Sequence, residues 1–407
     1  MTARPVVLLL HYTFPGIVGG VETVMAHHAA GLRVVADVGL VAGRGRAGVA
    51  GVSATRIRLL DSLHPAVVRV GRGARDGPPG SEFGRLRRSL VESLAPHLRG
   101  ADRVVLHNVT TLGFNLPLLA ALHDLAPALP AGRLVAWVHD LAPDTWLHSP
   151  GAAPDQDPRR LLGRPLPGAR YVAVSEERRA LIAQRLGLPS ADVRVVPNGV
   201  DVPGVLRLSP AGRDLADRLG LASADPLLVL PARLVRRKRV ELAIDAAEAL
   251  RRRGRGARLI VTGGPDPHDP DAAAYLAELR TRVARAGGSD VLLWDLLART
   301  ADDRLVADLY ALADALIFPS LSEGFGMPLL EAAATRLPIV CTDLSVFHSI
   351  AADAATYVPV AGDGDDFADA VARALAAGPA SALASRVRRG SDWRRIVAEQ
   401  VIPAILG

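Results

Sequence analysis

Residues 315–342 read ALIFPSLSEGFGMPLLEAAATRLPIVCT, and this stretch holds one strand, a glycine-containing loop, a helix and a second strand. Ala315–Pro319 and Ile339–Thr342 are short apolar runs typical of buried strands. Between them, Pro328–Thr335 favours a helix, with Pro328 at the first helical position. A strand, a helix and a strand in this order are the signature of a parallel βαβ unit.

The same alternation runs along the rest of the chain. In the first half it predicts helices over Val21–Leu32, Leu116–Leu125 and Glu176–Leu186 and strands over Val6–His11, Val34–Val41, Arg103–His107, Leu134–His139, Tyr171–Ser175 and Val193–Val196. In the second half it predicts helices over Arg239–Arg253 and Ala272–Ala286 and strands over Leu227–Pro231, Arg258–Gly263 and Val291–Trp294. We therefore predict an α/β protein with two Rossmann-like parallel-sheet domains, 1–203 and 204–390. Residues 391–407 should form a helical segment that packs back across the domains with the help of Trp393.

Three segments of the first half do not follow this alternation. Gly71–Ser81 and Pro150–Gly168 are rich in glycine and proline and are predicted to be long loops. Between them, Glu82–Leu98 is amphipathic, with apolar residues at helical spacing and arginines beside them. This segment fits either a helix on a membrane surface or a core-facing helix with a solvated basic side.

Composition limits the class of protein. A chain of 407 residues is long for one hydrophobic core and suits two domains of about 200 residues each. Hydrophobic residues make up 49% and charged residues 22%, as in globular proteins. No apolar run approaches the roughly 20 residues of a membrane-spanning helix, and we expect no signal peptide. The sole cysteine, Cys341, cannot form an intrachain disulfide, which fits a cytoplasmic protein.

The net charge of +6 comes from basic residues that are spread over the whole chain. Only 4% of residues are aromatic, whereas nucleic-acid binding favours basic stripes interleaved with aromatics. Most of the basic residues are therefore expected to be solvated surface arginines. The single lysine, Lys238, is an exception, because it can mark a place where a compact charge on a flexible stem is needed.

Two carboxylates converge on the loop and helix of residues 315–342. Glu323 lies in the loop, and Glu331 falls in the first turn of the helix. Gly324 and Gly326 leave room for a ligand, and free amides at a helix N-terminus can bind phosphate or hydroxyl oxygens. Ionised carboxylates accept hydrogen bonds from sugar and ribose hydroxyls. The plainer alternative is a capping carboxylate followed by a surface glutamate.

Glu323 through Glu331 resembles the E-x7-E signature of retaining glycosyltransferases with the GT-B fold, especially family 4. Other segments resemble further family motifs and occur in the family's order. They are Gly19-Gly20-Val21-Glu22 (the GG-x-E loop), His139-Asp140, Val174-Ser175-Glu176, Val196-Pro197-Asn198-Gly199-Val200-Asp201 (the interdomain turn), and Pro231-Ala232-Arg233-Leu234 with Lys238 (the diphosphate clamp). The resemblance spans residues 19 to 331.

The resemblance implies two Rossmann-like domains facing across a cleft, with the acceptor on the N-terminal domain and the nucleotide sugar on the C-terminal domain. It assigns catalytic roles to Glu323, His139, Arg233 and Lys238. It further assigns donor binding to Gly19, Gly20, Arg233, Lys238, Glu323, Gly324, Phe325, Gly326, Met327 and Glu331. Within that set, Glu331 would hold the ribose and Glu323 the transferred sugar, while amides of Phe325, Gly326 and Met327 assist.

Elementary chemistry is consistent with these roles. Two cations on a turn before a helix, Arg233 and Lys238, would neutralise the departing diphosphate. Each feature also has a plainer interpretation: a solvated arginine cluster around Lys238, a core histidine at His139, and a tight turn at Gly19 and Gly20.

The chain departs from the family pattern at two positions where the family usually has glycine. Arg239 follows the lysine of the clamp, and Arg336 precedes the proline that leads into the strand after Glu331. At both positions the resemblance therefore does not predict the local backbone geometry. The sequence offers no metal-binding cluster, and Asp363-Gly364-Asp365 is interpreted as a polar turn. No cofactor or metal is expected, because family members use the cationic clamp.

These observations predict retaining transfer of a hexosyl unit from a UDP- or GDP-sugar to a hydroxyl acceptor. The expected partners are the donor and the acceptor, without nucleic acid and with at most peripheral membrane contact. Two alternatives share the architecture: a sugar-nucleotide 2-epimerase and a non-catalytic sugar-nucleotide-binding protein. An NAD enzyme is disfavoured because Gly16–Gly20 does not spell G-x-G-x-x-G.

Overall fold

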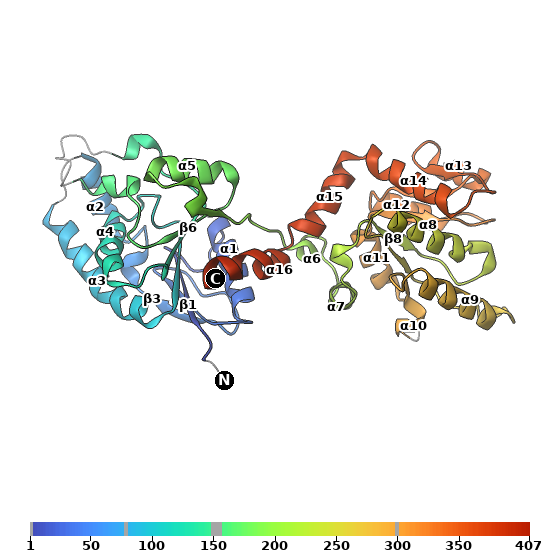
Figure 1. The fold of residues 1–407 in the computed structure, drawn as a ribbon, viewed down its shortest axis with the longest axis horizontal. Coiled ribbons are helices and arrows are strands. Elements are labelled where there is room, and N and C mark those ends of the chain that lie inside the picture. The colour runs from blue at the N-terminus through green and yellow to red at the C-terminus, as the bar shows by residue number, and fades with distance from the viewer. Residues whose placement is uncertain (1–2, 77–79, 148–156, 298–300) are drawn as a thin grey trace. The chain divides into compact units, whose positions relative to one another are not determined.

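The computed structural model describes residues 3–76, 80–147, 157–297 and 301–407. The chain divides into two compact units, Met1–Gly199 with Trp393–Gly407, and Val200–Asp392 (Figure 1). The boundary expected after residue 203 falls inside the short helix α6 (Val202–Val205). The division lies earlier because the amide of Val200 donates to the carbonyl of Ser391 at 2.7 Å, which ties the start of the second unit to its end.

The N-terminal unit is built on one parallel sheet of seven strands in the order β3-β2-β1-β4-β5-β6-β7. Every neighbouring pair is parallel. The strands are β1 (Val6–Leu10), β2 (Asp37–Ala42), β3 (Ser53–Arg56), β4 (Arg103–His107), β5 (Leu134–Val138), β6 (Arg170–Ala173) and β7 (Val193–Val195). Its long helices are α1 (Gly20–Leu32), α2 (Pro65–Asp76), α3 (Ser81–Gly100), α4 (Leu116–Leu125) and α5 (Glu176–Leu186).

Helices cover both faces of this sheet, because its strands are apolar on both sides. Val7 and Leu9 of β1 pack in one cluster with α1, whereas Leu10 packs in another with α3 and α4. This alternation is the period of two expected of a strand.

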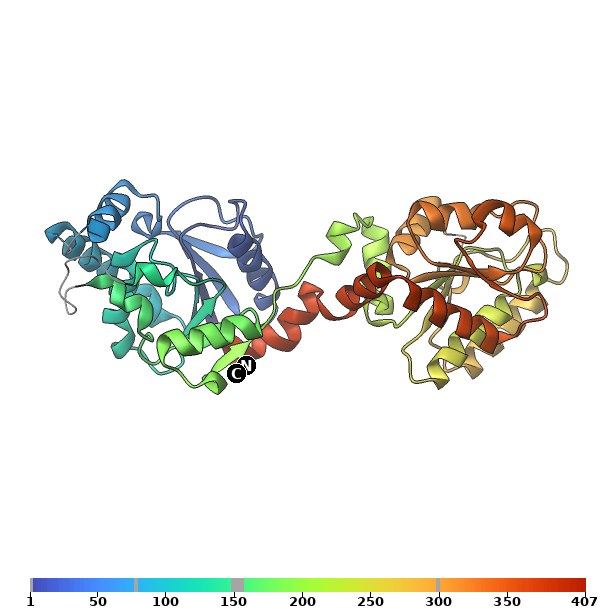
Figure 2. The same ribbon diagram turned by 90° about the horizontal axis from the view of Figure 1, so that it is seen from above.

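The C-terminal segment belongs to the N-terminal unit (Figures 1 and 2). It comprises α16 (Trp393–Ile396), a π-helical stretch (Val397–Val401) and α17 (Ile402–Leu406). Trp393 stacks on His27 of α1, with ring centroids 5.0 Å apart, and Arg103 donates to the carbonyl of Ile405 at 2.9 Å.

The C-terminal unit has one parallel sheet of six strands in the order β10-β9-β8-β11-β12-β13. The strands are β8 (Leu227–Leu230), β9 (Arg258–Val261), β10 (Val291–Leu292), β11 (Ala315–Phe318), β12 (Ile339–Thr342) and β13 (Thr356–Val358). The helices are α7 (Pro210–Leu219), α8 (Val240–Arg252), α9 (Ala272–Arg285), α10 (Leu293–Leu297), α11 (Asp303–Leu312), α12 (Met327–Ala334), α13 (Ser345–Ala351), α14 (Gly364–Ala377) and α15 (Pro379–Gly390). Two Rossmann-like parallel-sheet domains of the α/β class, as predicted, are thus confirmed.

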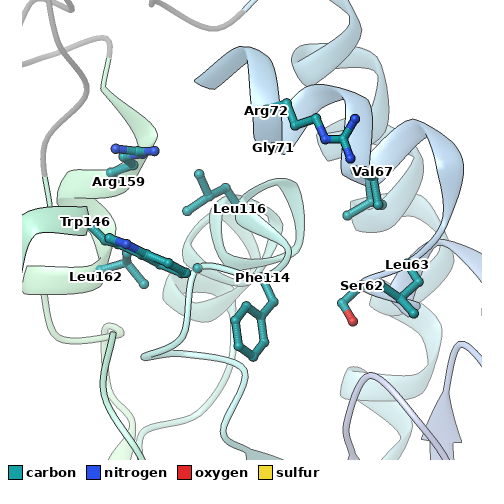
Figure 3. A pocket seen from close by; sticks show the side chains of 12 residues that line it. Ser62, Leu63, Val67, Gly71, Arg72, Phe114, Leu116, Trp146, Arg159 and Leu162 are labelled. Carbon is teal, nitrogen blue, oxygen red and sulfur yellow. The ribbon is translucent and has the colours of Figure 1, made fainter. Parts of the chain in front are cut away.

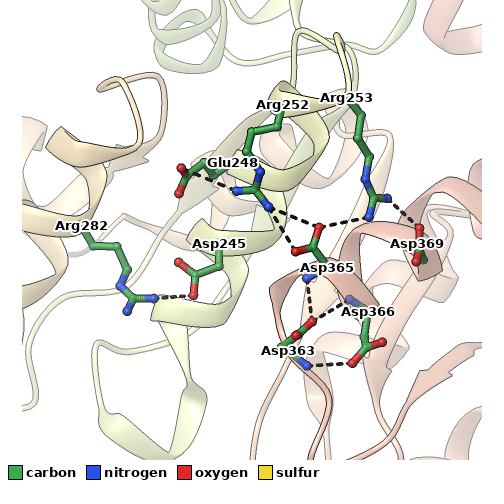
Figure 4. Close-up of polar contacts among 9 residues, drawn as sticks. All are labelled: Asp245, Glu248, Arg252, Arg253, Arg282, Asp363, Asp365, Asp366 and Asp369. Carbon is green, nitrogen blue, oxygen red and sulfur yellow. Dashed lines mark hydrogen bonds and ion pairs between the residues drawn. The ribbon is translucent and has the colours of Figure 1, made fainter.

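Ion pairs join α14 to α8 on the surface of this unit (Figure 4). Asp365 pairs with Arg252 and with Arg253, each at 3.1 Å, and Arg253 also reaches Asp369 at 2.6 Å. Asp363 caps α14, and its own amide donates to Asp366 in a capping box. The segment Asp363-Gly364-Asp365, expected to be a plain turn, is therefore the start of a helix.

Two other predictions need correction. Residues 71–76 of the expected loop Gly71–Ser81 are the end of α2, since Val67 and Val70 give this helix an apolar side that is buried despite its glycines. The expected strand Val291–Trp294 is strand only in β10, and Leu293 begins α10. Of the expected loop Pro150–Gly168, residues 150–156 lie outside the described residues, and Pro158–Gly163 form a 3₁₀-helix.

The amphipathic segment Glu82–Leu98 forms most of α3. Its apolar side chains, from Phe83 to Leu98, are buried in the clusters beneath the helix. The membrane-surface interpretation is therefore wrong, because the apolar face is already covered by protein. Among the described residues, no helix combines the length and the apolar character that crossing a bilayer requires.

Candidate active site

The predicted carboxylate loop lies between β11 and α12 of the C-terminal unit, at the carboxyl end of the sheet. Gly326, immediately before α12, has φ 110° and ψ 45°, a conformation that L side chains rarely adopt. A Cβ at this position would also stand 3.0 Å from the ring of Phe347. The glycine therefore fixes the turn that leads from Glu323 into the helix.

Glu323 forms an ion pair with Lys238, which comes from the turn between β8 and α8. Both side chains are nearly buried, with 9% and 11% of their surface exposed. Arg237 adds a second cation at 3.2 Å, and the Lys238 ammonium lies over the ring of Phe318 at 4.6 Å. The structure thus brings together two predicted residues that are far apart in the sequence.

The pKa values of this pair reflect burial and mutual attraction. Burial alone would raise the pKa of Glu323, but the hydrogen bond from Lys238 and the charges of Lys238 and Arg237 hold it below its ordinary value. Burial lowers the pKa of Lys238, and its bond to Glu323 opposes that shift. Glu323 is therefore an ionised carboxylate held between two cations.

Glu331 has a different environment. It lies in α12 and is exposed, and one carboxylate oxygen accepts a hydrogen bond of 2.7 Å from the hydroxyl of Tyr310. Burial raises the pKa of Tyr310, and its bond to Glu331 raises it further, so the phenol stays a donor. The other carboxylate oxygen has room for a second donor.

Arg233 is not joined to the Lys238–Glu323 pair. Its side chain is 65% exposed, and it faces Asp266 across 3.8 Å. Phe325 and Met327 are about half exposed, at 53% and 55%, and Gly324 has open space beside its Cα. These members of the predicted donor set are therefore accessible, unlike the nearly buried pair.

Gly19 and Gly20 lie at the start of α1 in the N-terminal unit. Gly19 has an extended backbone, and a Cβ there would stand 2.1 Å from a carboxylate oxygen of Glu22, so this flexible side chain would have to move. Apart from its chain neighbours and the backbone of its own helix, no described residue has an atom within 4 Å of the place where a Cβ of Gly20 would stand. The start of this helix is therefore open on the side of Gly20.

His139 follows β5 and belongs to a group of histidines at the carboxyl ends of neighbouring strands. Its Nε2 lies 3.3 Å from Nδ1 of His107, the last residue of β4. His11, which follows β1, donates from Nδ1 to the carbonyl of His107 at 2.7 Å. His28 of α1 lies beneath them, with its ring 5.2 Å from that of His107. We call His11, His28, His107 and His139 the histidine group.

All four histidines are held neutral at neutral pH. Burial, with a smaller effect of neighbouring histidines, lowers the pKa of His139 to about 4 and that of His28 to about 3. Burial also lowers the pKa of His107 and of His11. His139 is therefore an uncharged hydrogen-bonding group positioned by His107.

Sequence reasoning missed the neighbours of the predicted residues. Arg237, Tyr310, His107 and His11 each contact a predicted site residue or its direct partner. A signal for the histidines was present, since His11, His107 and His139 each end or follow a predicted strand. No sequence signal pointed to Tyr310.

Two family models match the chain. Residues 18–202 match the model described as Glycosyltransferase Family 4, and residues 225–377 match that described as Glycosyl transferases group 1.

Curated relatives include two proteins named D-inositol 3-phosphate glycosyltransferase. The one from Nocardia farcinica is 32% identical over 213 residues, which is 51% of this chain and 45% of that protein. The one from Actinosynnema mirum is 34% identical over 235 residues, or 52% of each chain. The chain thus spans about half the length of these relatives.

A further relative is matched over more of its length. It comes from Mycobacterium tuberculosis, is named GDP-mannose-dependent alpha-(1-6)-phosphatidylinositol monomannoside mannosyltransferase, and is 30% identical over 309 residues. The match covers 66% of this chain and 76% of the relative. Among solved structures, Anabaena Alr3699/HepE with UDP and glucose aligns over 98% of this chain and 99% of its own, at 18% identity and a TM-score of 0.34. The sequence matches to the relatives and to both models are consistent with the E-x7-E site, and the chain belongs to the glycosyltransferases of family 4.

Proposed function

We propose that this protein transfers a hexosyl unit from a nucleoside diphosphate sugar to a hydroxyl acceptor, with retention at the anomeric carbon. The observation that carries the proposal is the nearly buried ion pair of Lys238 and Glu323, which Arg237 also contacts. An isolated buried ion pair contributes little to stability. A pair beside an exposed glycine loop and a helix N-terminus suits an anionic ligand that carries hydroxyl groups.

The cations would act on the leaving group. As the bond between the anomeric carbon and the donor oxygen breaks, its electron pair moves to the diphosphate, whose charge grows. The Lys238 ammonium has three donors, so it can serve Glu323 and a phosphate oxygen together. Arg233, bound only loosely by Asp266, can turn to the diphosphate. These cations supply the charge that a divalent ion would otherwise supply, and we expect transfer to persist in EDTA.

The carboxylates would orient the donor. Glu323 is held by Lys238 and Arg237, which makes it a poor nucleophile and a good acceptor for sugar hydroxyls. This favours attack by the acceptor hydroxyl on the face that the diphosphate leaves, with the acceptor's proton passing to a leaving phosphate oxygen. Glu331 would accept from the ribose through the carboxylate oxygen that Tyr310 does not use. The neutral imidazole of His139 would hydrogen-bond the sugar without repelling a cationic transition state.

The names of the relatives guide the choice of donor. The Mycobacterium tuberculosis relative is named for GDP-mannose. GDP-mannose is therefore the first donor to test, and a UDP-sugar, the other donor class that the sequence predicts, is the second.

Lys238→Ala tests the proposal most directly. Losing a charge-assisted contact to the leaving group, worth ~1.4 kcal/mol or more in the transition state, should lower kcat/KM for transfer at least about tenfold. Arg236→Ala is the matched control, because Arg236 neighbours Lys238 but pairs with the exposed Glu278 at 3.0 Å. Product formation is followed by mass spectrometry, and NMR gives the anomeric configuration.

Three results would contradict the proposal: full activity of Lys238→Ala, an inverted product, or conversion of the donor sugar without any acceptor. The last result would identify an epimerase. Nucleotide-sugar binding without turnover on a broad hydroxyl panel would instead favour a non-catalytic binding protein.

A further inference from the structure

The N-terminal unit has a pocket of about 410 Å³ among α2, the loop after β4, α4 and the 3₁₀-helix of residues 158–163 (Figure 3). This volume lies in the range of small-molecule sites. The pocket contains none of the predicted donor residues, most of which belong to the C-terminal unit.

One part of the pocket wall is apolar and aromatic, whereas the rest of the lining is polar. Phe114 and Trp146 meet edge to face, with ring centroids 6.4 Å apart, and Leu116 and Leu162 form a buried floor with 4% and 1% exposure. Phe114 itself is 48% exposed, although a large apolar side chain is usually covered. Such walls fit an apolar ring or chain.

The charge that lines the pocket has one sign. Arg72 and Arg159 are among its lining residues, whereas none of the lining residues that the structure describes is acidic. Figure 3 shows the two guanidinium groups toward one end of the pocket and Phe114 toward the other. Arg72 is exposed and forms no ion pair within the described part of the chain, unlike Arg69 one turn earlier, which pairs with Glu82 at 2.6 Å. This favours a ligand with an anionic group beside its apolar part.

Two joined loops connect the pocket to His139. The side chain of Asn108, after β4, accepts from the amides of His139 at 3.0 Å and Asp140 at 2.9 Å. Thr111, in the same loop, forms two hydrogen bonds with the loop after β5. Its hydroxyl donates to the carbonyl of Asp140 at 2.7 Å, and its carbonyl accepts from the amide of Ala142 at 2.8 Å. The loops that present His139 also present Phe114 and Trp146, so the pocket and His139 share one carboxyl edge of the sheet.

We propose that this pocket binds the acceptor, and that the acceptor is a hydroxyl compound with an apolar part and an anionic group. The apolar part packs on Phe114 and Trp146, and the anionic group pairs with Arg72. This inference rests on the proposed transfer reaction, which requires an acceptor in addition to the donor held by the C-terminal unit.

The test uses 2-naphthyl phosphate as the probe and the full chain, with binding measured by calorimetry. Wild-type protein should bind it more tightly than neutral 2-naphthol. Phe114→Ala and Arg72→Ala should each weaken binding at least about fivefold. Leu181→Ala, an exposed apolar side chain on α5, and Arg88→Ala, an exposed arginine on α3, are the matched controls outside the pocket. Neither control should change the affinity.

GDP and UDP binding, measured in the same variants, separates this inference from the proposed function. Unchanged nucleotide binding together with weakened probe binding, and inhibition of transfer by the probe, would support the acceptor pocket. Failure of wild-type protein to bind the probe, or equal binding by all variants, would overturn it even if transfer is found. Probe binding without any transfer activity on either donor would overturn the acceptor role and the proposed function together.

Discussion

At the residue scale, the two departures from the family's glycines have a common geometry. Arg239 and Arg336 have φ values of 49° and 58°, the left-handed region in which an L side chain is strained. The backbone strain at Arg239 is partly offset, because its guanidinium donates to the carbonyls of Val360 at 2.8 Å and Gly362 at 3.0 Å. The family's glycines therefore reflect backbone conformation, and the arginines keep that conformation here.

Arg336 ends α12 in a Schellman motif. Its amide donates to Ala333 at 3.0 Å, and the amide of Leu337 donates to Ala332 at 2.9 Å. Arg336→Gly should raise the free energy of unfolding of the C-terminal unit by about 0.5–1 kcal/mol, since the relief of strain exceeds the entropy that glycine loses. Urea unfolding measures the change.

Arg336→Ala keeps the Cβ and removes the guanidinium, so it serves as the control. An equal gain in both variants would show that charge, and not the backbone, is responsible.

At the element scale, the ends of neighbouring strands create the sites. Strand order places β1, β4 and β5 side by side, which gathers His11, His107 and His139 at one edge. In the other unit, β8 and β11 are neighbours, and this brings the turn that carries Lys238 to the loop that carries Glu323. Ligands of parallel sheets bind at such edges.

The histidine group makes stability depend on pH. The unfolded chain binds protons at an ordinary histidine pKa of ~6.5, whereas folded His139 binds them at about 4 and His28 at about 3. Below pH 6.5 the unfolded state therefore binds more protons, and stability falls as pH falls toward 4. Each such histidine lowers the free energy of unfolding by up to roughly 1.4 kcal/mol for each unit by which the pH falls. Chemical unfolding of the N-terminal unit at pH 7, 6, 5 and 4.5 measures this slope.

His28→Phe should make the slope shallower, because it removes a histidine whose pKa is lowered in the folded state. Nδ1 of His28 is buried and has no hydrogen-bond partner among the residues that the structure describes, so no bond at this atom is lost. His97→Gln, at a half-buried position on α3 outside the histidine group, is the matched control. Identical pH profiles for wild-type protein and His28→Phe would refute the linkage to this group.

At the scale of the whole molecule, the chain crosses from the N-terminal unit to the C-terminal unit and returns. The returning segment fills part of the N-terminal core, with Trp393, Ile396, Val401 and Ile405 each at most 5% exposed. The N-terminal unit is therefore incomplete without the last residues of the sequence.

Removing residues 393–407 should destabilise the N-terminal unit and leave the C-terminal unit nearly unchanged. Truncation of one large buried apolar side chain costs about 2–5 kcal/mol, so the milder variant Ile396→Ala should already lower the unfolding free energy by about that amount. Hydrogen exchange, followed separately on peptides from each unit, measures the change in stability of the N-terminal unit and of the C-terminal unit independently. A uniform loss of protection across both units would contradict this assignment.

The sequence by itself determined the two runs of βαβ units, the carboxylate loop and the motifs of the family resemblance, because each unit and each motif consists of residues close together along the chain. It also predicted α3, whose apolar spacing is regular over most of its length, but it missed β3, a short exposed edge strand with the sequence SATR. Only the tertiary structure decided that Lys238 neutralises Glu323, that Tyr310 binds Glu331, and that His107 positions His139. These contacts join residues brought together by strand order, and strand order depends on packing among distant elements and not on any local pattern.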